Sequence, residues 1–273
     1  PRLRLSVQLP IGSADRRSGE KKLDLQLIGK TCLVTGASAG IGTAIARSLA
    51  QEGARLVITA RRKERLDAVA ADISARTGNT PLTICADLMA NEAPEAIRDF
   101  VLEHLGGVDI LVNNAGLSSP PDPMAADDVW DAGFNLKFTT VRRLTNALMP
   151  QMRARGWGRI INVTGIVEPM ATSAALTACA AVHAWAKGLS RDLAAEGITI
   201  NSIPPGRIES EQIRRNYSDD NMRSRFIKRY IPKGRFGAPE ELADLVTFLC
   251  SPRAGYITGT VIPVDGGMSR FAI

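Results

Sequence analysis

A glycine-rich stretch, residues 35–42, is the first part of this chain whose residue types could do chemistry. A short apolar run, residues 31–34, precedes it, and a segment with apolar residues at helical spacing follows it. Strand, glycine turn and helix in this order point backbone N–H groups and the positive end of a helix dipole at a phosphate. An ordinary strand-to-helix corner is the alternative. We predict a dinucleotide pyrophosphate site formed by Gly36, Ser38, Ala39, Gly40, Ile41 and Gly42.

Two adjacent arginines, Arg61 and Arg62, follow the second apolar run, residues 55–60. In dinucleotide-binding folds an acidic residue at this place holds the ribose 2′-hydroxyl. Arginine instead favours a 2′-phosphate, which it binds through charge-assisted, bidentate hydrogen bonds. Two exposed arginines at a helix start are the alternative interpretation. The pair therefore favours NADP(H) over NAD(H).

Further polar and small residues follow other apolar runs, where parallel strands would end. The carboxyl ends of parallel strands face the ligand crevice of such a fold. We expect these residues to line the cofactor site as well: Asp87, Leu88, Asn114, Ala115, Gly116, Pro205, Gly206 and Ile208.

The elements that must position these residues alternate along the chain. Apolar, β-rich runs are separated by segments of helical periodicity, which predicts a parallel sheet covered by helices on both faces. The sequence shows no internal repeat and no second domain. We predict an α/β, single-domain, doubly wound Rossmann fold with about seven strands, at residues 31–34, 55–60, 81–86, 108–112, 159–163, 198–203 and 261–264. Expected helices include residues 92–105 and 124–152.

With these motifs, residues 28–270 closely resemble the classical short-chain dehydrogenase/reductase family, near its 3-oxoacyl carrier-protein reductase type. The resemblance implies NAD(P)(H) binding and a homodimer or homotetramer. The residues that carry it are 35–42, Asp87-Leu88, 113–116, Asn135 within Phe134-Asn135-Leu136-Lys137, Pro205-Gly206, and the tail segments 235–241, 256–259 and 264–267.

The resemblance breaks down at the catalytic positions. The family chemistry uses a serine, a Tyr-x-x-x-Lys pair on one helix face and an asparagine, with the lysine lowering the tyrosine pKa. Counting back from residues 197–201 puts Ala175 at the tyrosine position and Cys179 at the lysine position. The serine position falls at Thr164 or Gly165. None of the three tyrosines is followed four residues later by lysine, because the residues there are Asn221, Gly234 and Thr260.

Several side chains could replace the missing groups. Asn135 retains the family asparagine, and the Thr164 hydroxyl can make the hydrogen bonds of a serine. Tyr217 lies in residues 210–231, the segment that in this family folds over the substrate, where it could donate a proton or, as the favoured alternative, merely line the pocket. We therefore name Asn135, Thr164 and Tyr217 as catalytic candidates. His183, one turn beyond Cys179, and Glu168 are alternatives, although packing against a partner subunit is the favoured explanation of His183 and loop carboxylates such as Glu168 are mostly solvated.

Two functions fit this pattern. In the first, the protein is an NADP(H)-dependent oxidoreductase that acts on a small carbonyl or alcohol substrate with a non-standard proton relay. In the second, it is a catalytically silent relative that binds cofactor and acts as a regulator, or as a partner subunit of an active family member in a mixed oligomer. The intact glycine turn supports a working cofactor site in both.

Charge, hydropathy and cysteine spacing argue against nucleic-acid binding, a membrane span and a metal or disulfide framework. The net charge is +6, but residues 1–30 carry seven basic and three acidic side chains, which leaves only +2 for the rest. We read this as a basic arm rather than a nucleic-acid interface. No apolar run approaches the length of a membrane span. The four cysteines have no metal-ligand or disulfide spacing, which favours a cytoplasmic setting. We expect residues 1–27 to be a partly flexible extension of a domain spanning 28–273.

Overall fold

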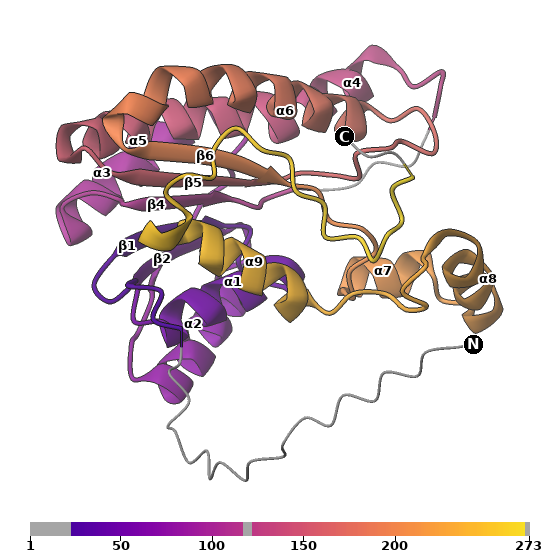
Figure 1. Cartoon of the computed structure of the whole chain (residues 1–273), viewed down its shortest axis with the longest axis horizontal. Helices are drawn as coiled ribbons and strands as arrows, with labels where there is room; N and C mark the ends of the chain where they lie inside the picture. The colour runs from indigo at the N-terminus through magenta and orange to yellow at the C-terminus, as the bar shows by residue number, and fades with distance from the viewer. Residues whose placement is uncertain (1–22, 117–121, 271–273) are drawn as a thin grey trace, which may run out of the picture.

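The computed structural model describes residues 23–116 and 122–270. Most of the expected N-terminal extension therefore lies outside the described residues. Six parallel strands form one sheet in the order β3-β2-β1-β4-β5-β6 (Figure 1). Their bounds are β1 Thr31–Thr35, β2 Arg55–Ala60, β3 Leu82–Cys85, β4 Ile110–Asn113, β5 Gly158–Val163 and β6 Ile198–Ile203. The chain order reverses between β1 and β4, the place where doubly wound sheets bind ligands.

Side-chain alternation divides the core into two layers. In β1, Cys32 and Val34 pack on one face of the sheet, and Leu33 packs on the other. Both faces are apolar because helices cover both, as expected for a parallel sheet. The first face carries α1 Gly40–Gln51, α2 Lys63–Thr77 and α9 Pro239–Cys250, and the second carries α3 Ala93–Leu105, α5 Thr140–Arg155 and α6 Ala174–Leu193 (Figure 1). The predicted doubly wound α/β fold is confirmed.

The seventh predicted strand, residues 261–264, does not form a regular strand. It runs beside β6 and makes only isolated parallel bridges, Ser202 to Val261 and Pro205 to Val264. The backbone N–H groups of Ile262 and Val264 still donate to carbonyls of that neighbour, at 2.9 and 3.0 Å. Prolines at 204, 205 and 263 lack the N–H that a continuous ladder needs. The described sheet therefore has six strands rather than about seven.

The expected helix over residues 124–152 is divided into three. It consists of α4 Asp127–Phe134, a π-helical turn η1 Asn135–Thr139, and α5. The Thr140 N–H donates to the carbonyl of Asn135, five residues back. This wider turn changes the direction of the side chains that follow Asn135. Single π-helical turns inside helices are frequent at functional sites.

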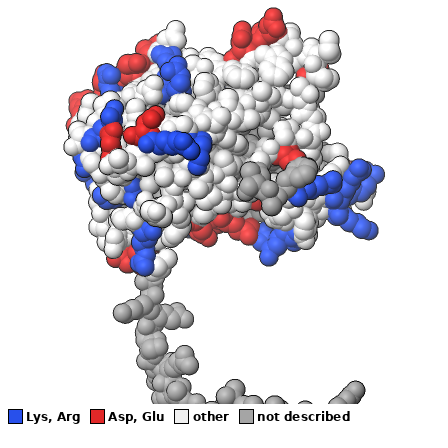
Figure 2. Space-filling view, turned by 45° about the horizontal axis from the view of Figure 1, so that its top comes forward, with Lys and Arg blue, Asp and Glu red and all other residues white. Residues whose placement is uncertain are grey.

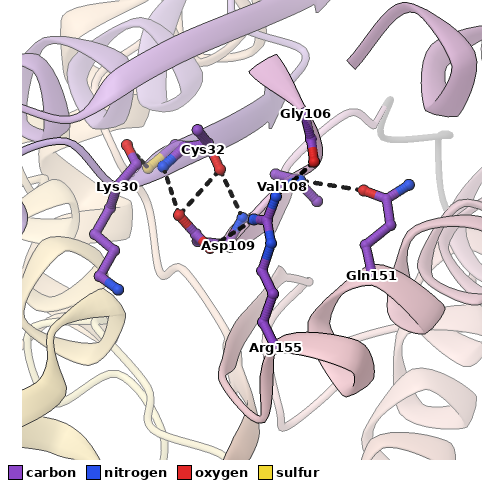
Figure 3. Close-up of polar contacts among 8 residues, drawn as sticks. Lys30, Cys32, Gly106, Val108, Asp109, Gln151 and Arg155 are labelled. Atoms are coloured by element: carbon purple, nitrogen blue, oxygen red, sulfur yellow. Dashed lines mark hydrogen bonds and ion pairs between the residues drawn. The ribbon is translucent and has the colours of Figure 1, made fainter. Parts of the chain in front are cut away.

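A network of polar side chains closes the amino-terminal edge of the sheet (Figure 3). The Asp109 carboxylate accepts hydrogen bonds from the Thr31 N–H at 2.9 Å and the Thr31 hydroxyl at 3.0 Å. Arg155 donates to the same carboxylate at 2.8 Å and to the Gly106 carbonyl at 2.6 Å. The network joins the starts of β1 and β4 to the end of α5.

Residues 210–231 form the predicted covering segment. It contains α7 Glu211–Asn216 and α8 Asp220–Tyr230, which lie beyond the carboxyl ends of the strands (Figure 1). The Ser210 and Asp219 side chains cap these helices by accepting backbone N–H groups. The two remaining short elements are the 3-10 turns η2 Ala194–Glu196 and η3 Pro252–Ala254. Over the described part of the chain, no helix is both long and apolar enough for a membrane span.

Candidate functional site

The glycine turn joins β1 to α1 and is held against the end of β4. Gly36 has φ +65°, and a Cβ there would lie 2.8 Å from Ala115 Cα. A Cβ at Gly42 would overlap the Gly36 carbonyl oxygen. The Asn114 side chain donates to the carbonyls of Thr35 and Gly36 at 3.0 and 3.2 Å. Only glycine fits at positions 36 and 42, and α1 therefore begins with its N–H groups directed toward the crevice.

Arg61 and Arg62 lie exposed immediately after β2, as predicted. A carboxylate that sequence reasoning did not associate with them, Glu211 of α7, lies nearby. Arg65 of α2 donates to both Glu211 oxygens, at 2.9 and 2.8 Å. Hydrogen bonding and charge from Arg65, with a smaller contribution from Arg62, lower the pKa of Glu211. The first turn of α2 and the covering segment therefore meet beside the arginine pair.

A cleft of about 590 Å³ runs along the outer side of the glycine turn. Its lining includes Ser38, Ala39 and Gly40 of the turn, together with Arg65 and Ser210. The cleft extends toward α2 and α7, so it borders the predicted pyrophosphate site but does not reach the residues after β4 and β5. Its lining does not include Arg61, Arg62, Asp87 or Leu88, so the cleft meets the predicted cofactor site only at the glycine turn.

The remaining predicted cofactor residues lie at the carboxyl edge of the sheet. Asp87 is exposed after β3, and its carboxylate accepts the Met89 N–H at 3.1 Å. Leu88 is buried, and its carbonyl accepts the Thr140 hydroxyl. Gly206, next to Pro205, approaches Asp265 so closely that a Cβ would lie 2.6 Å from its Cα. Ile208 is 4% exposed and is bridged to Gly237, so it belongs to the core at this edge.

Asn135 and Lys137 share the π-helical turn η1 beside the end of β4. Both are half-buried. A Cβ on Gly116 would overlap the Lys137 ammonium and lie 2.6 Å from its Cε, so the lysine crosses the run that follows β4. In the sequence, Lys137 stands out only as the last residue of Phe134-Asn135-Leu136-Lys137. Lys137 lies two residues after Asn135. This spacing indicates a site residue only when the π-helical turn at Asn135–Thr139 is known.

Ala175 and Cys179 lie on the inner face of α6 and are 7% and 2% exposed. A Cβ on Gly165 would lie 3.4 Å from Cys179 Sγ, which puts this helix face against the end of β5. Burial raises the pKa of the Cys179 thiol, and the charge of Lys137 opposes that rise. The thiol is therefore protonated near neutral pH and supplies no charge.

Thr164, the first residue after β5, is paired with His183. Thr164 Oγ1 and His183 Nε2 share a hydrogen bond of 2.9 Å. Thr164 is 7% exposed and also donates its N–H to the Ile203 carbonyl at 3.1 Å. Burial lowers the pKa of His183, so the imidazole is neutral near pH 7. The two candidates that the sequence treated separately therefore form one pair.

Tyr217 lies in an aromatic cluster within the covering segment. Its ring packs edge-on against Phe226 and Phe236, at centroid distances of 5.1 and 5.3 Å. Arg207 donates to its hydroxyl oxygen at 3.0 Å. This accepted bond leaves the hydroxyl proton available for donation. Glu168, the other acidic candidate, accepts the Arg270 backbone N–H at 2.9 Å.

Basic side chains gather on the covering segment, at the right of Figure 2 where α8 lies. The exposed members are Arg214, Arg215, Arg225, Lys228 and Arg229. Among the residues that the structure describes, no group of three or more His, Cys, Asp or Glu side chains is arranged to hold a metal ion. All four cysteines are free thiols.

This geometry has counterparts in known proteins. The chain matches the family model described as enoyl-(acyl carrier protein) reductase over residues 36–269. The chain belongs to the classical short-chain dehydrogenase/reductase family. A 3-oxoacyl-[acyl-carrier-protein] reductase of Aquifex aeolicus is 34% identical over 257 residues, which cover 90% of this chain and 100% of that protein. The corresponding reductase of Escherichia coli is 36% identical over 244 residues, covering 88% and 97%.

Solved structures of this family share the fold closely. L-sorbose reductase from Gluconobacter frateurii, in a complex with NADPH and L-sorbose, superposes with a TM-score of 0.86 at 34% identity, covering 92% of this chain and 100% of that one. YwfH, described as an NADPH-dependent reductase involved in bacilysin biosynthesis, superposes with a TM-score of 0.85 at 30% identity, covering 89% and 100%. The resemblance inferred from the sequence motifs is therefore confirmed for the family and the fold.

Proposed function

We propose that this protein is an NADP(H)-dependent oxidoreductase that transfers hydride between the cofactor and a small carbonyl or alcohol substrate. The glycine turn carries the proposal: α1 begins with free N–H groups at the switch point of the sheet, and glycine is obligatory at positions 36 and 42. Arg61 and Arg62 support NADP(H), because they are exposed where the family fold holds the adenosine ribose. The related L-sorbose reductase, whose structure contains NADPH, also supports NADP(H) as the cofactor.

The residues present fit the cofactor. When bound, it would supply the hydride, while the N–H groups at residues 38–42 would hold its pyrophosphate and the arginine pair would hold a 2′-phosphate. We also propose a non-standard catalytic site, because Ala175 and Cys179 stand where the family places tyrosine and lysine. Asn135 would orient the reacting groups, Thr164 would hydrogen-bond the substrate oxygen, and Tyr217 would donate a proton from the covering segment.

The second candidate is a catalytically silent cofactor-binding subunit. The observation that favours it is the chemistry of the inner α6 face, where a methyl group and a protonated thiol replace an acid and a permanent charge. The homodimer or homotetramer expected from the family, and the cytoplasmic setting, remain predictions. A mixed oligomer with an active family member belongs to this second candidate and would appear as a heteromeric species in light scattering.

The first experiment is a fluorescence titration with NADPH and, in parallel, NADH. Tight binding with preference for NADPH is expected, and binding of neither would contradict the proposal for the isolated chain. Turnover is then measured by loss of NADPH absorbance with a 3-oxoacyl thioester and with a ketose, the substrate types of the named relatives. Binding without turnover on a broad carbonyl panel would favour the silent candidate. If turnover is found, unchanged rates in Tyr217→Phe would remove Tyr217 as the proton donor.

A further inference from the structure

Lys137 differs from the other basic residues near the crevice in where its charge lies. Its side chain is half-buried and runs from the π-helical turn η1 over Gly116, so its ammonium lies beside the run that ends β4. Its charge also acts on Cys179 of α6. The ammonium therefore lies beside the end of β4, near enough to Cys179 of α6 for its charge to act on the thiol.

The backbone around Lys137 is built to allow this position. Lys137 lies within the π-helical turn, where the helical path is wider than in a regular α-helix, and its side chain reaches Gly116 at the end of β4. Gly116 leaves the space that the lysine side chain occupies, because a Cβ there would lie 2.6 Å from the Lys137 Cε and would displace that side chain. Two separate segments thus accommodate one cation. A lysine on the surface extends into solvent and needs no such space beside a glycine of a neighbouring segment.

The ammonium has no counter-ion in the part of the chain described. Within residues 23–116 and 122–270, several arginines and Lys63 form ion pairs, but no carboxylate lies at ion-pair distance from Lys137. An ammonium has three N–H donors, and removing it partly from water without partners is costly. A ligand with hydroxyl or anionic oxygens would supply those partners.

The location identifies which ligand group that is. A doubly wound sheet binds the two nucleotide halves of a dinucleotide on opposite sides of its switch point. The glycine turn and the arginine pair belong to β1 and β2, and therefore to the adenosine half. Gly116, Lys137 and Cys179 belong to β4 and the elements beyond it, and therefore to the nicotinamide half.

We propose that Lys137, reaching from the π-helical turn rather than from α6, supplies the cation that holds the nicotinamide ribose of the bound cofactor. The inference rests on the proposed function. Its ammonium would donate hydrogen bonds to the ribose hydroxyls, and its charge would occupy the region that the Cys179 side chain leaves uncharged. The chain would thus have moved this cation from one helix to another while keeping it in the same half of the crevice.

The test compares two ligands that differ in the nicotinamide half. NADPH binding is followed by fluorescence, and adenosine 2′,5′-bisphosphate, which contains only the adenosine half, is followed by calorimetry, both on the full chain. In Lys137→Met we expect NADPH to bind about tenfold more weakly, because charge-assisted hydrogen bonds are lost. The bisphosphate should bind as it does to the unchanged protein. Its binding also reports that the variant is folded.

Three further variants make the result specific. Lys137→Gln carries the same expectation as Lys137→Met, whereas Lys137→Arg should keep most of the NADPH affinity because it keeps the charge. Lys187→Met removes an exposed lysine of α6, two turns beyond Cys179, and should change neither affinity. Equal NADPH affinity in Lys137→Met and the unchanged protein would overturn the inference, as would equal weakening of both ligands. If the unchanged protein bound neither ligand, the proposed function itself would fail.

Discussion

Polar side chains at the two edges of the sheet differ in whether they have partners within the chain. At the amino-terminal edge, Asp109 is 15% exposed in its side chain and accepts from Thr31 and Arg155 at 2.8 to 3.0 Å (Figure 3). At the carboxyl-terminal edge, Arg61 and Arg62 are exposed, and neither forms an ion pair within the described residues. The starts of β1 and β4 therefore lie in a network of hydrogen bonds within the chain, whereas the end of β2 leads into arginines that are available to a ligand.

This difference indicates which edge stabilises the protein and which edge binds. Asp109, Thr31 and Arg155 are hydrogen-bonded to one another, so removing the carboxylate leaves the other two unsatisfied in a partly buried place. The arginine pair and Lys137 keep their donors available, which preserves the capacity to bind an anion or a hydroxyl; only the half-buried Lys137 loses hydration in doing so. Substitutions at the two edges should therefore separate stability from affinity.

The largest expected effect is at the amino-terminal edge. Asp109→Ala should lower the free energy of unfolding by about 3 kcal/mol, because Thr31 and Arg155 lose a shared, mostly buried acceptor. Asp67→Ala, which removes an exposed carboxylate paired with Lys63 on α2, should cost less than about 0.5 kcal/mol. Urea unfolding measures both. If folded Asp109→Ala lost NADPH affinity while keeping its stability, the proposed division between the two edges would be wrong.

A smaller effect is expected at the carboxyl-terminal edge of the sheet, where Arg61 and Arg62 follow β2. Replacing Arg61 and Arg62 together by alanine should weaken NADPH binding about tenfold to thirtyfold and leave NADH binding unchanged, since only NADPH carries the 2′-phosphate. Arg55→Ala is the matched control, because Arg55 is an exposed arginine at the amino end of the same strand. Fluorescence titration measures all four affinities. Equal loss of NADPH and NADH affinity would argue against a 2′-phosphate site.

The smallest effect concerns the pH dependence of stability at the Thr164–His183 pair. Burial lowers the pKa of His183 in the folded protein below its ordinary value of 6.5. The unfolded chain then binds the proton more readily, so this contribution to stability is fully present above pH 6.5 and is lost as pH falls toward the folded-state pKa. His183→Asn should flatten this part of the unfolding profile between about pH 7 and pH 5.

The histidine prediction has an internal control. His104, the only other histidine, is partly exposed in α3 and contacts the Phe100 carbonyl of its own helix. His104→Asn should leave the slope between about pH 7 and pH 5 in place. If the His183→Asn profile kept the slope of the unchanged protein, His183 would not be the group that titrates, and the pair would contribute to packing only.

Local patterns predicted the strands and the first part of the site well. The runs at 55–60 and 198–203 match β2 and β6, because buried parallel strands are continuously apolar and bounded by glycine or polar residues. The prediction of a seventh strand at residues 261–264 was wrong. It counted apolar residues and did not consider that the nearby prolines lack the N–H groups that a continuous ladder needs. The helix over 124–152 was predicted as continuous, because helical periodicity cannot detect one added residue at Asn135.

The sequence by itself determined the order of the strands along the chain, the glycine turn at residues 35–42 and the arginine pair after β2, because these depend on neighbouring residues and on backbone sterics. Only the tertiary structure decided which side chains meet. It pairs Thr164 with His183 and Arg65 with Glu211. It also brings the Lys137 side chain over Gly116. These contacts join segments 19 and 146 residues apart, or cross a π-helical turn. Such distances are fixed by how helices and strands pack, which no local pattern encodes.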